Sequence, residues 1–193
     1  MSQTPHADSE TTDPRILRSR RMLMDSLARL LTKKEFEDIS VQEIADEADL
    51  NRATFYLHYP DKAALLQSMT DLRFRSLLER RNISFTDCEG ALRAMVLGVC
   101  DYLAETTGCP GQLARIPLEG SIIPVIEGMF REGLARHAMA PGADAALQAT
   151  TAAWAIFGAA RRWFQTSDRI PAEEMAAKIA ALVKPILFSA SSS

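Results

Sequence analysis

The sequence predicts an all-α protein of about nine helices, in which a short N-terminal helical domain precedes a larger helical domain. Apolar residues recur three and four positions apart through most of the chain, which places them on one face of a helix. No segment shows the convincing alternation of apolar and polar residues that a half-buried strand would show. Stretches containing Gly and Pro, such as 108–117 and 141–142, separate the periodic segments and mark helix ends.

The first predicted helix spans residues 14–34. Asp13 is a good capping residue, and Pro14 fits the first position of a helix. Residues 1–13 are polar and acidic and lack the basic and apolar regions of a signal peptide, so we expect a solvated tail. After the helix, the chain is expected to turn, with Phe36 and Ile39 filling the core beneath that turn.

Two short helices are predicted next. Ser40 is followed three residues later by Glu43, the capping-box pattern, and starts a helix at 41–48. Asn51 caps a second helix at about 52–58, and Asp61 caps a long fourth helix. Helices of about eight residues are unstable alone in water, so these two must pack on their neighbours. Two short helices joined by a tight turn and backed by a longer one form a helix-turn-helix.

The second half of the chain is rich in alanine and predicts further helices at 89–106, 122–138, 143–166 and 171–188, with a short turn at 112–116. The expected organisation is a tail, an N-terminal domain, a second helical domain and a short tail, at residues 1–13, 14–77, 78–189 and 190–193.

Composition excludes several classes of protein. The net charge is −3, but residues 14–82 carry 13 Lys and Arg against 11 Asp and Glu, so an anionic partner must be met by a local patch. No apolar run is long enough for a membrane span, and three cysteines are too few and too oddly spaced for a disulfide framework or a zinc site. We therefore expect a cytoplasmic protein that does not contact membranes.

Catalysis is not expected. The three histidines are scattered, and the chain has no phosphate-binding loop, dinucleotide fingerprint or nucleophile elbow. The prediction is a protein without enzymatic activity, cofactor or metal.

Three segments carry a family likeness: Ser40 to Ala45, Ala48 to Tyr59 with its Thr-Phe-Tyr-x-His-Tyr block, and Lys62 to Leu66. Together they resemble the DNA-binding domain of the TetR family of bacterial transcriptional regulators, over residues 14–77. Residues 155–163 are similar to the late dimerisation helix of that family.

Two positions depart from the family pattern. Asp49 stands where the family usually has Gly, and we expect a left-handed backbone there, which Asp tolerates better than most residues. Gln42 stands where many members have Arg, so it is expected to weaken one base or phosphate contact or change the base that is preferred.

A helix-turn-helix reads base edges in the major groove, with phosphate contacts setting the register. We expect Arg52 to donate to a guanine, and Ala53 and the Thr54 methyl to touch a thymine methyl. Gln42 reaches a base by analogy with the family. The expected DNA-contacting set is Ser40, Gln42, Arg52, Ala53, Thr54, Tyr56, His58 and Lys62.

Structural roles remain open for several of these residues. Arg52 is alternatively a solvated arginine, Tyr56 is as readily a packing residue, and a lone histidine such as His58 more often serves the fold.

A single recognition helix reads few base pairs, so a homodimer on double-stranded DNA is expected. The interface is predicted in helices 143–166 and 171–188, because Gly158 and several alanines allow close helix approach. The alternative is a tightly packed pair within one chain.

The resemblance also implies a small-molecule effector that releases a repressor from a palindromic operator. Candidate pocket residues are Met95, Val99, Tyr102, Ile116, Met129, Phe130, Trp154 and Phe157, each of which is alternatively core filler. The alternative function is a helical ligand-binding or interaction protein of the same fold that binds no operator.

Overall fold

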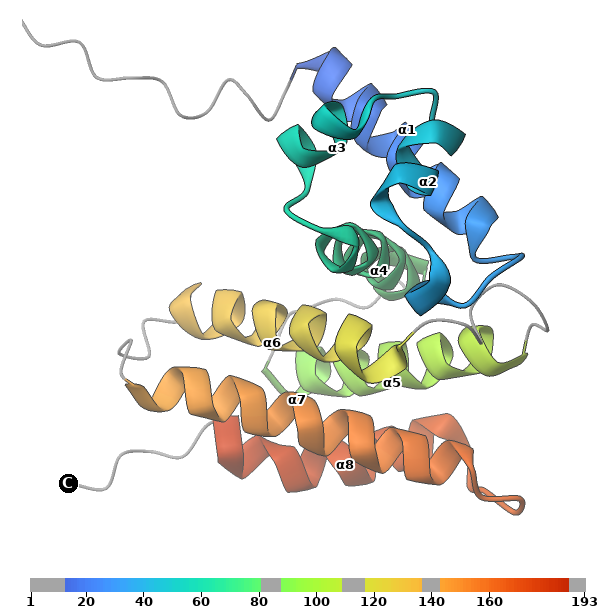
Figure 1. Ribbon diagram of the computed structural model, residues 1–193. Helices are drawn as coiled ribbons and strands as arrows, with labels where there is room; N and C mark the ends of the chain where they lie inside the picture. Colours follow the sequence, from blue (N-terminus) through green and yellow to red (C-terminus); the bar gives the residue numbers. More distant parts are fainter. Residues whose placement is uncertain (1–12, 81–87, 109–116, 137–142, 188–193) are drawn as a thin grey trace, which may run out of the picture. The chain divides into compact units, whose positions relative to one another are not determined.

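The computed structural model describes residues 13–80, 88–108, 117–136 and 143–187 (Figure 1). The described residues are all-helical, with no strand. Their elements, in chain order, are α1 (Pro14–Leu30), the 3₁₀ helix η2 (Phe36–Asp38), α2 (Val41–Glu47), α3 (Arg52–His58), α4 (Lys62–Arg80), α5 (Cys88–Gly108), α6 (Leu118–Arg136), α7 (Ala143–Phe164) and α8 (Ala172–Leu187). The chain divides into two compact units, residues 1–69 and 70–193, with the boundary inside α4.

The capping predictions are confirmed. The Asp13 side chain accepts a hydrogen bond from the Arg15 backbone N–H at 2.8 Å, and Pro14 occupies the first turn of α1. Ser40 and Glu43 form the reciprocal capping box of α2. The Asn51 side chain accepts from the backbone N–H of Thr54 at 2.7 Å at the start of α3. These contacts are local in sequence, which is why the residue types alone predict them.

Two helix ends differ from the sequence-based expectation. α1 ends at Leu30, because the N–H groups of Lys33 and Lys34 both bond to the Leu30 carbonyl and turn the chain. That turn brings Phe36 and Ile39 into the core, where they are 5% and 1% exposed, as predicted. α6 begins earlier than expected, at Leu118. The predicted turn at 112–116 lies outside the described residues.

Asp49 has a φ of 55°, the left-handed conformation expected for the turn between α2 and α3. Among the described residues other than glycine, it alone has a positive φ. The Leu50 N–H then bonds back to the Ala45 carbonyl at 2.9 Å and closes the turn. A residue with a short polar side chain thus adopts the left-handed conformation that glycine adopts freely.

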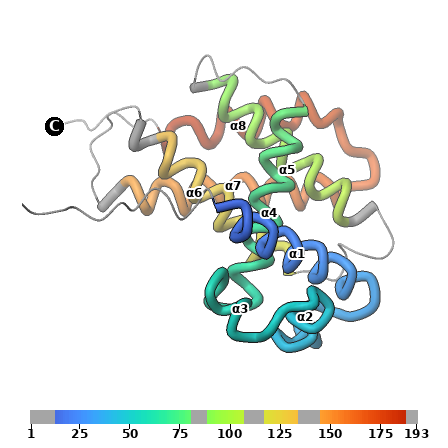
Figure 2. The backbone as a smooth tube through the Cα atoms, turned by 90° about the horizontal axis from the view of Figure 1, so that it is seen from above, coloured from blue at the N-terminus to red at the C-terminus, as the bar shows by residue number. Residues whose placement is uncertain are grey.

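The first unit is built around α1, which contacts both α2 and α3 (Figure 2). Its core consists of side chains that are entirely out of contact with solvent, namely Leu23, Leu27, Ile44, Ala45, Phe55 and Leu65. Burial of these side chains holds the two seven-residue helices in place, because neither is long enough to be stable alone.

In the second unit, α7 contacts α5, α6 and α8. Four alanines of α7 are fully buried within the single chain: Ala149, Ala152, Ala153 and Ala160. These small residues therefore serve packing inside the unit, which is the alternative that the sequence left open for them. These four alanines are therefore not available to an interface between two chains.

Gly98 marks the closest approach between α5 and residues 70–80 of α4. A Cβ atom at this position would lie 2.7 Å from Leu78 Cδ2 and 3.1 Å from the Phe74 ring. Both neighbours are buried, at 7% and 0% exposure, so they have little room to move. Glycine is required here by space and not by backbone conformation.

We predict that Gly98→Ala lowers the free energy of unfolding by about 1–3 kcal/mol through overpacking. The matched control is Gly128→Ala in α6, where a Cβ meets nothing within 4 Å; this change should stabilise by about 0.5–1 kcal/mol, because alanine is the better helix former. Urea unfolding followed by circular dichroism measures both. Equal effects of the two substitutions would contradict the close approach.

Candidate nucleic-acid interface

The tip of α3 is an exposed part of the helix-turn-helix. Arg52 and Ala53 are exposed and Thr54 is half-buried, whereas Phe55 is 0% exposed and anchors the opposite side of the helix. The Thr54 hydroxyl donates to Asn51 Oδ1 at 2.9 Å. Its oxygen thus belongs to the helix cap, which leaves the methyl group as the part of Thr54 suited to an apolar contact.

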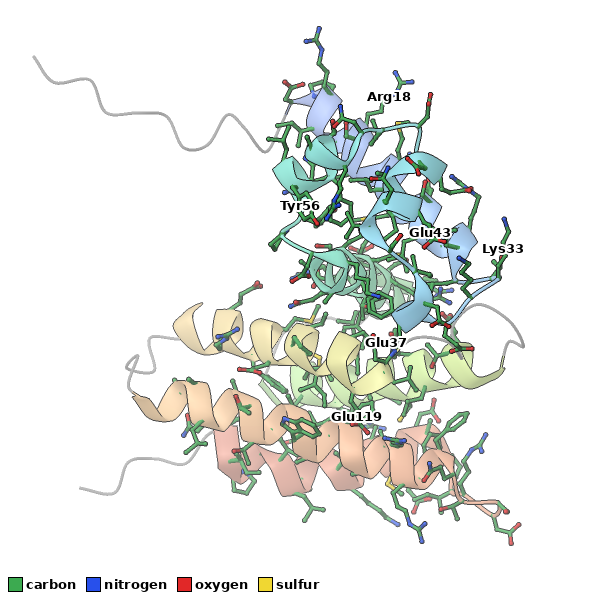
Figure 3. The ribbon with its side chains drawn as sticks, in the orientation of Figure 1. Arg18, Lys33, Glu37, Glu43, Tyr56 and Glu119 are labelled. Carbon is green, nitrogen blue, oxygen red and sulfur yellow. The ribbon has the colours of Figure 1, made fainter. Side chains whose placement is uncertain are left out.

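Arg52 is held by Tyr56, one turn further along α3. Arg52 Nη2 donates to the Tyr56 hydroxyl at 3.2 Å, and the guanidinium carbon lies 5.5 Å from the centre of the Tyr56 ring. Tyr56 is 46% exposed (Figure 3) and packs edge-on against Phe55. A guanidinium has five N–H donors, so this single bond orients Arg52 and leaves donors for an acceptor such as guanine.

Ser40 and Gln42 lie at the start of α2. The backbone N–H and the hydroxyl of Ser40 both donate to Glu43 Oε2, each at 2.9 Å. Both donors are therefore used by the fold in this structure, and a contact of Ser40 with DNA stays a prediction. Gln42 is exposed, and its Nε2 donates to Asp46 Oδ1 at 2.7 Å.

Glu43 is also paired with Lys34. Hydrogen bonds from Lys34 and then Ser40 lower the pKa of the Glu43 carboxyl from 4.5 to about 2. Because the folded-state pKa is the lower one, this arrangement favours folding above about pH 4.5 and is lost as the pH falls toward 2.

Lys62 also serves the fold. Its ammonium donates to three backbone carbonyls around η2: Phe36 at 2.9 Å, Glu37 at 2.8 Å and Ile39 at 2.8 Å. An ammonium has three protons, and in this structure all three are directed at these carbonyls. Lys62 thus holds η2 against α4, and its contact with DNA stays a prediction.

His58 is half-buried at the end of α3. Burial, and secondarily the charge of Arg20, lower the pKa of its imidazole below the usual value. A neutral imidazole attracts phosphate weakly. The structural role that the sequence left open therefore fits His58 better than a phosphate contact.

Leu57 is exposed on α3 and was not among the predicted contacts. Its side chain is 81% exposed, and it lies one turn after Ala53, on the side of α3 away from Phe55. Sequence reasoning treats a leucine as core, which explains the omission. The sequence signal for its exposure was its position on the side of the helix opposite Phe55.

The predicted pocket residues lie in the second unit and divide into three groups. Met95, Val99, Tyr102 and Phe157 are buried, and Met129 and Phe130 are half-buried. Trp154 is 52% exposed, so it does not belong with the buried set, and Ile116 lies outside the described residues. The Tyr102 hydroxyl lies 3.3 Å from the Ser121 hydroxyl, and burial raises the pKa of Tyr102.

Comparison with known proteins agrees with this geometry. Residues 23–69 match the family described as bacterial regulatory proteins, tetR family. A TetR-family regulator from Streptomyces coelicolor has the same fold over 97% of this chain and 99% of its own, with a TM-score of 0.62 and 16% identity. The matched residues contain the helix-turn-helix, and the likeness over the rest of the chain is one of fold.

Two curated relatives match over shorter stretches. The HTH-type transcriptional regulator EthR of Mycolicibacterium smegmatis is 33% identical over 94 residues, covering 45% of this chain and 42% of that protein. The nucleoid occlusion factor SlmA of a Shewanella species is 30% identical over 80 residues, covering 42% of this chain and 40% of that protein. The chain thus spans less than half the length of either relative.

Among the described helices, none is long and apolar enough to cross a membrane.

We predict that Lys62→Met lowers the free energy of unfolding by about 2 kcal/mol, because three backbone acceptors lose a charged donor while the aliphatic stem is kept. Its affinity for DNA should fall without a change in the salt dependence. A phosphate contact would instead reduce the slope of log K against log salt by about 0.9. Chemical unfolding and a salt titration of DNA binding distinguish the two roles.

Proposed function

We propose that this chain is a sequence-specific DNA-binding transcriptional repressor that binds a palindromic operator as a homodimer and is released by a small-molecule effector. The observation that carries the proposal is the exposed tip of α3. The bond to Tyr56 orients Arg52 but uses only one of its N–H donors. Arg52 lies beside the exposed Cβ of Ala53. A guanidinium next to a small apolar group suits a guanine beside a thymine methyl in the major groove.

The α3 tip supports base contacts more strongly than phosphate contacts. Two of the predicted phosphate contacts, Ser40 and Lys62, donate to groups within the protein. The proposed DNA contacts are Arg52, Ala53, Thr54, Gln42 and Tyr56. Leu57 is added to them because its side chain is exposed. Specific recognition therefore depends on a few side chains at the ends of α2 and α3.

A two-fold dimer is proposed because two recognition helices are needed to distinguish an operator from other DNA. The exposed side of α7 supports it: Leu147, Trp154 and Gly158 are exposed at a spacing that places them on one face. Leu182 of α8 is 76% exposed. Large apolar side chains in water favour burial against a second copy, and Leu147, Trp154 and Leu182 all lie in the predicted interface helices 143–166 and 171–188.

The effector is proposed to bind within the second unit, near the buried residues Met95, Val99 and Phe157. The Tyr102 and Ser121 hydroxyls supply a buried polar pair in this unit. The effector releases the operator only if it binds the DNA-free conformation more tightly than the DNA-bound one.

We expect wild-type protein to bind selected palindromic duplexes with an affinity that falls steeply with salt, because phosphate neutralisation releases counterions. Arg52→Ala should cost about 1–3 kcal/mol of discrimination at one base position in each half-site. The control is Arg21→Ala on α1, which removes the same charge from an exposed site and should weaken all sequences alike. Competition binding against a panel of single-base operator variants measures this.

Absence of any sequence preference in wild-type protein, at every salt concentration, would contradict operator binding. It would favour the alternative of a helical ligand-binding or interaction protein that has kept the fold.

We predict that Trp154→Glu raises the dimer dissociation constant at least about tenfold, because a buried interface tryptophan commonly contributes 2 kcal/mol or more. Leu72→Glu is the matched control, since Leu72 of α4 is 62% exposed and lies outside α7 and α8. Analytical ultracentrifugation over a concentration series measures both. A dimer equally stable in the two variants would exclude this face of α7 as the interface.

A further inference from the structure

Gln42 and Asp46 form an exposed polar pair on α2. They lie one helical turn apart, and Gln42 Nε2 donates to Asp46 Oδ1 at 2.7 Å. Ile44 and Ala45, the buried residues of this helix, are 0% exposed. The pair therefore contributes nothing to the core, and its exposed polar atoms can contact a partner of α2.

The chemistry of Asp46 determines which way the Gln42 amide points. An ionised carboxylate only accepts hydrogen bonds, so the amide atom facing Asp46 must be the NH₂ group. The amide oxygen, Gln42 Oε1, and the second N–H of Nε2 are then left for a partner. The second carboxylate oxygen of Asp46 is likewise an acceptor, so the pair offers mainly acceptors.

Asp46 differs from the other two carboxylates of α2, because both of those are ion-paired. Glu43 is paired with Lys34, and Glu47 with Arg29. In the part of the chain that the structure describes, the Asp46 carboxylate receives a hydrogen bond from Gln42 and has no ion pair. Its negative charge therefore stays on the surface of a helix that is proposed to approach DNA.

We infer that the Gln42–Asp46 pair reads a base that carries an amino group in the major groove, with cytosine preferred. This inference rests on the proposed operator binding. Cytosine N4 and adenine N6 present donors there, whereas guanine and thymine present acceptors that the pair repels. Adenine also presents the acceptor N7 beside its amine, and that atom faces unfavourable charge from Asp46. Cytosine has no such acceptor on this edge.

Asp46 is thus a specificity-determining residue as well as a positioning residue for Gln42. A glutamine without this neighbour can turn its amide and commonly binds adenine through both polar atoms. A surface carboxylate near phosphates weakens binding to all DNA, so its contribution lies in rejecting guanine and thymine at one position.

The test measures the affinity of the full-length protein for its selected operator, with each of the four bases placed in turn at every position. For wild-type protein we expect one position in each half-site where cytosine is bound best, adenine next, and guanine at least about tenfold more weakly. Asp46→Asn replaces the carboxylate by a group that can also donate, which frees the Gln42 amide to turn. The preference for cytosine over guanine should then fall below about threefold at that position only.

A second variant and a control keep the test decisive. Gln42→Arg should move the preferred base at the same position to guanine, because a guanidinium donates to O6 and N7. Asp25→Asn on α1 removes the same charge from an exposed site and should shift all four bases together.

The inference is overturned if Asp46→Asn leaves the cytosine preference intact. It is also overturned if the Gln42→Arg variant keeps its base preference at the position that depends on Arg52 but changes the preferred base at no position. Wild-type protein that selects no sequence at all overturns the proposed function, and this inference with it.

Discussion

Burial of Phe55 is the constraint on which the recognition element depends. α3 has seven residues, too few for its own hydrogen bonds to keep it helical in water, and Phe55 is completely removed from solvent. Burying such a side chain contributes about 1.5–3 kcal/mol. The Asn51 cap and the left-handed Asp49 then fix where the helix starts and how the chain enters it. With one side of the helix anchored, Ala53 and Leu57 must face away from the core.

The cations of the first unit divide into those that hold the fold and those that remain available. Lys62 binds three carbonyls, Lys34 pairs with Glu43, and Arg29 bonds to both the side chain and the carbonyl of Glu47. These contacts tie α1, η2, α2 and α4 into one scaffold. A chain with little excess positive charge in this region then depends on a few oriented side chains, such as Arg52, for recognition. Such an interface favours specificity over general attraction to DNA.

α7 has two apolar sides: one packs within the chain, and the other is exposed. Its buried alanines let α5, α6 and α8 approach closely, and this packing is complete within one chain. Its exposed side carries Leu147 and Trp154, and the packing of the buried alanines does not explain why these two apolar side chains are there. A helix that is apolar almost all round is expected to be covered all round, which is the physical basis for the proposed dimer.

The sequence by itself determined the helical class, the caps, the left-handed turn and the family likeness, because each depends on residues within a few positions of one another. Tertiary structure decided which donors remain free. The carbonyls that bind Lys62 lie 23–26 residues before it, so no local pattern reveals that this ammonium is occupied. The exposure of Trp154 was likewise not predicted, since apolar residues are assigned to the core by type. For Leu57 only its helical position opposite Phe55 gave a signal. Local hydrogen bonds follow from neighbouring residues, whereas exposure and the saturation of polar groups follow from how distant segments pack.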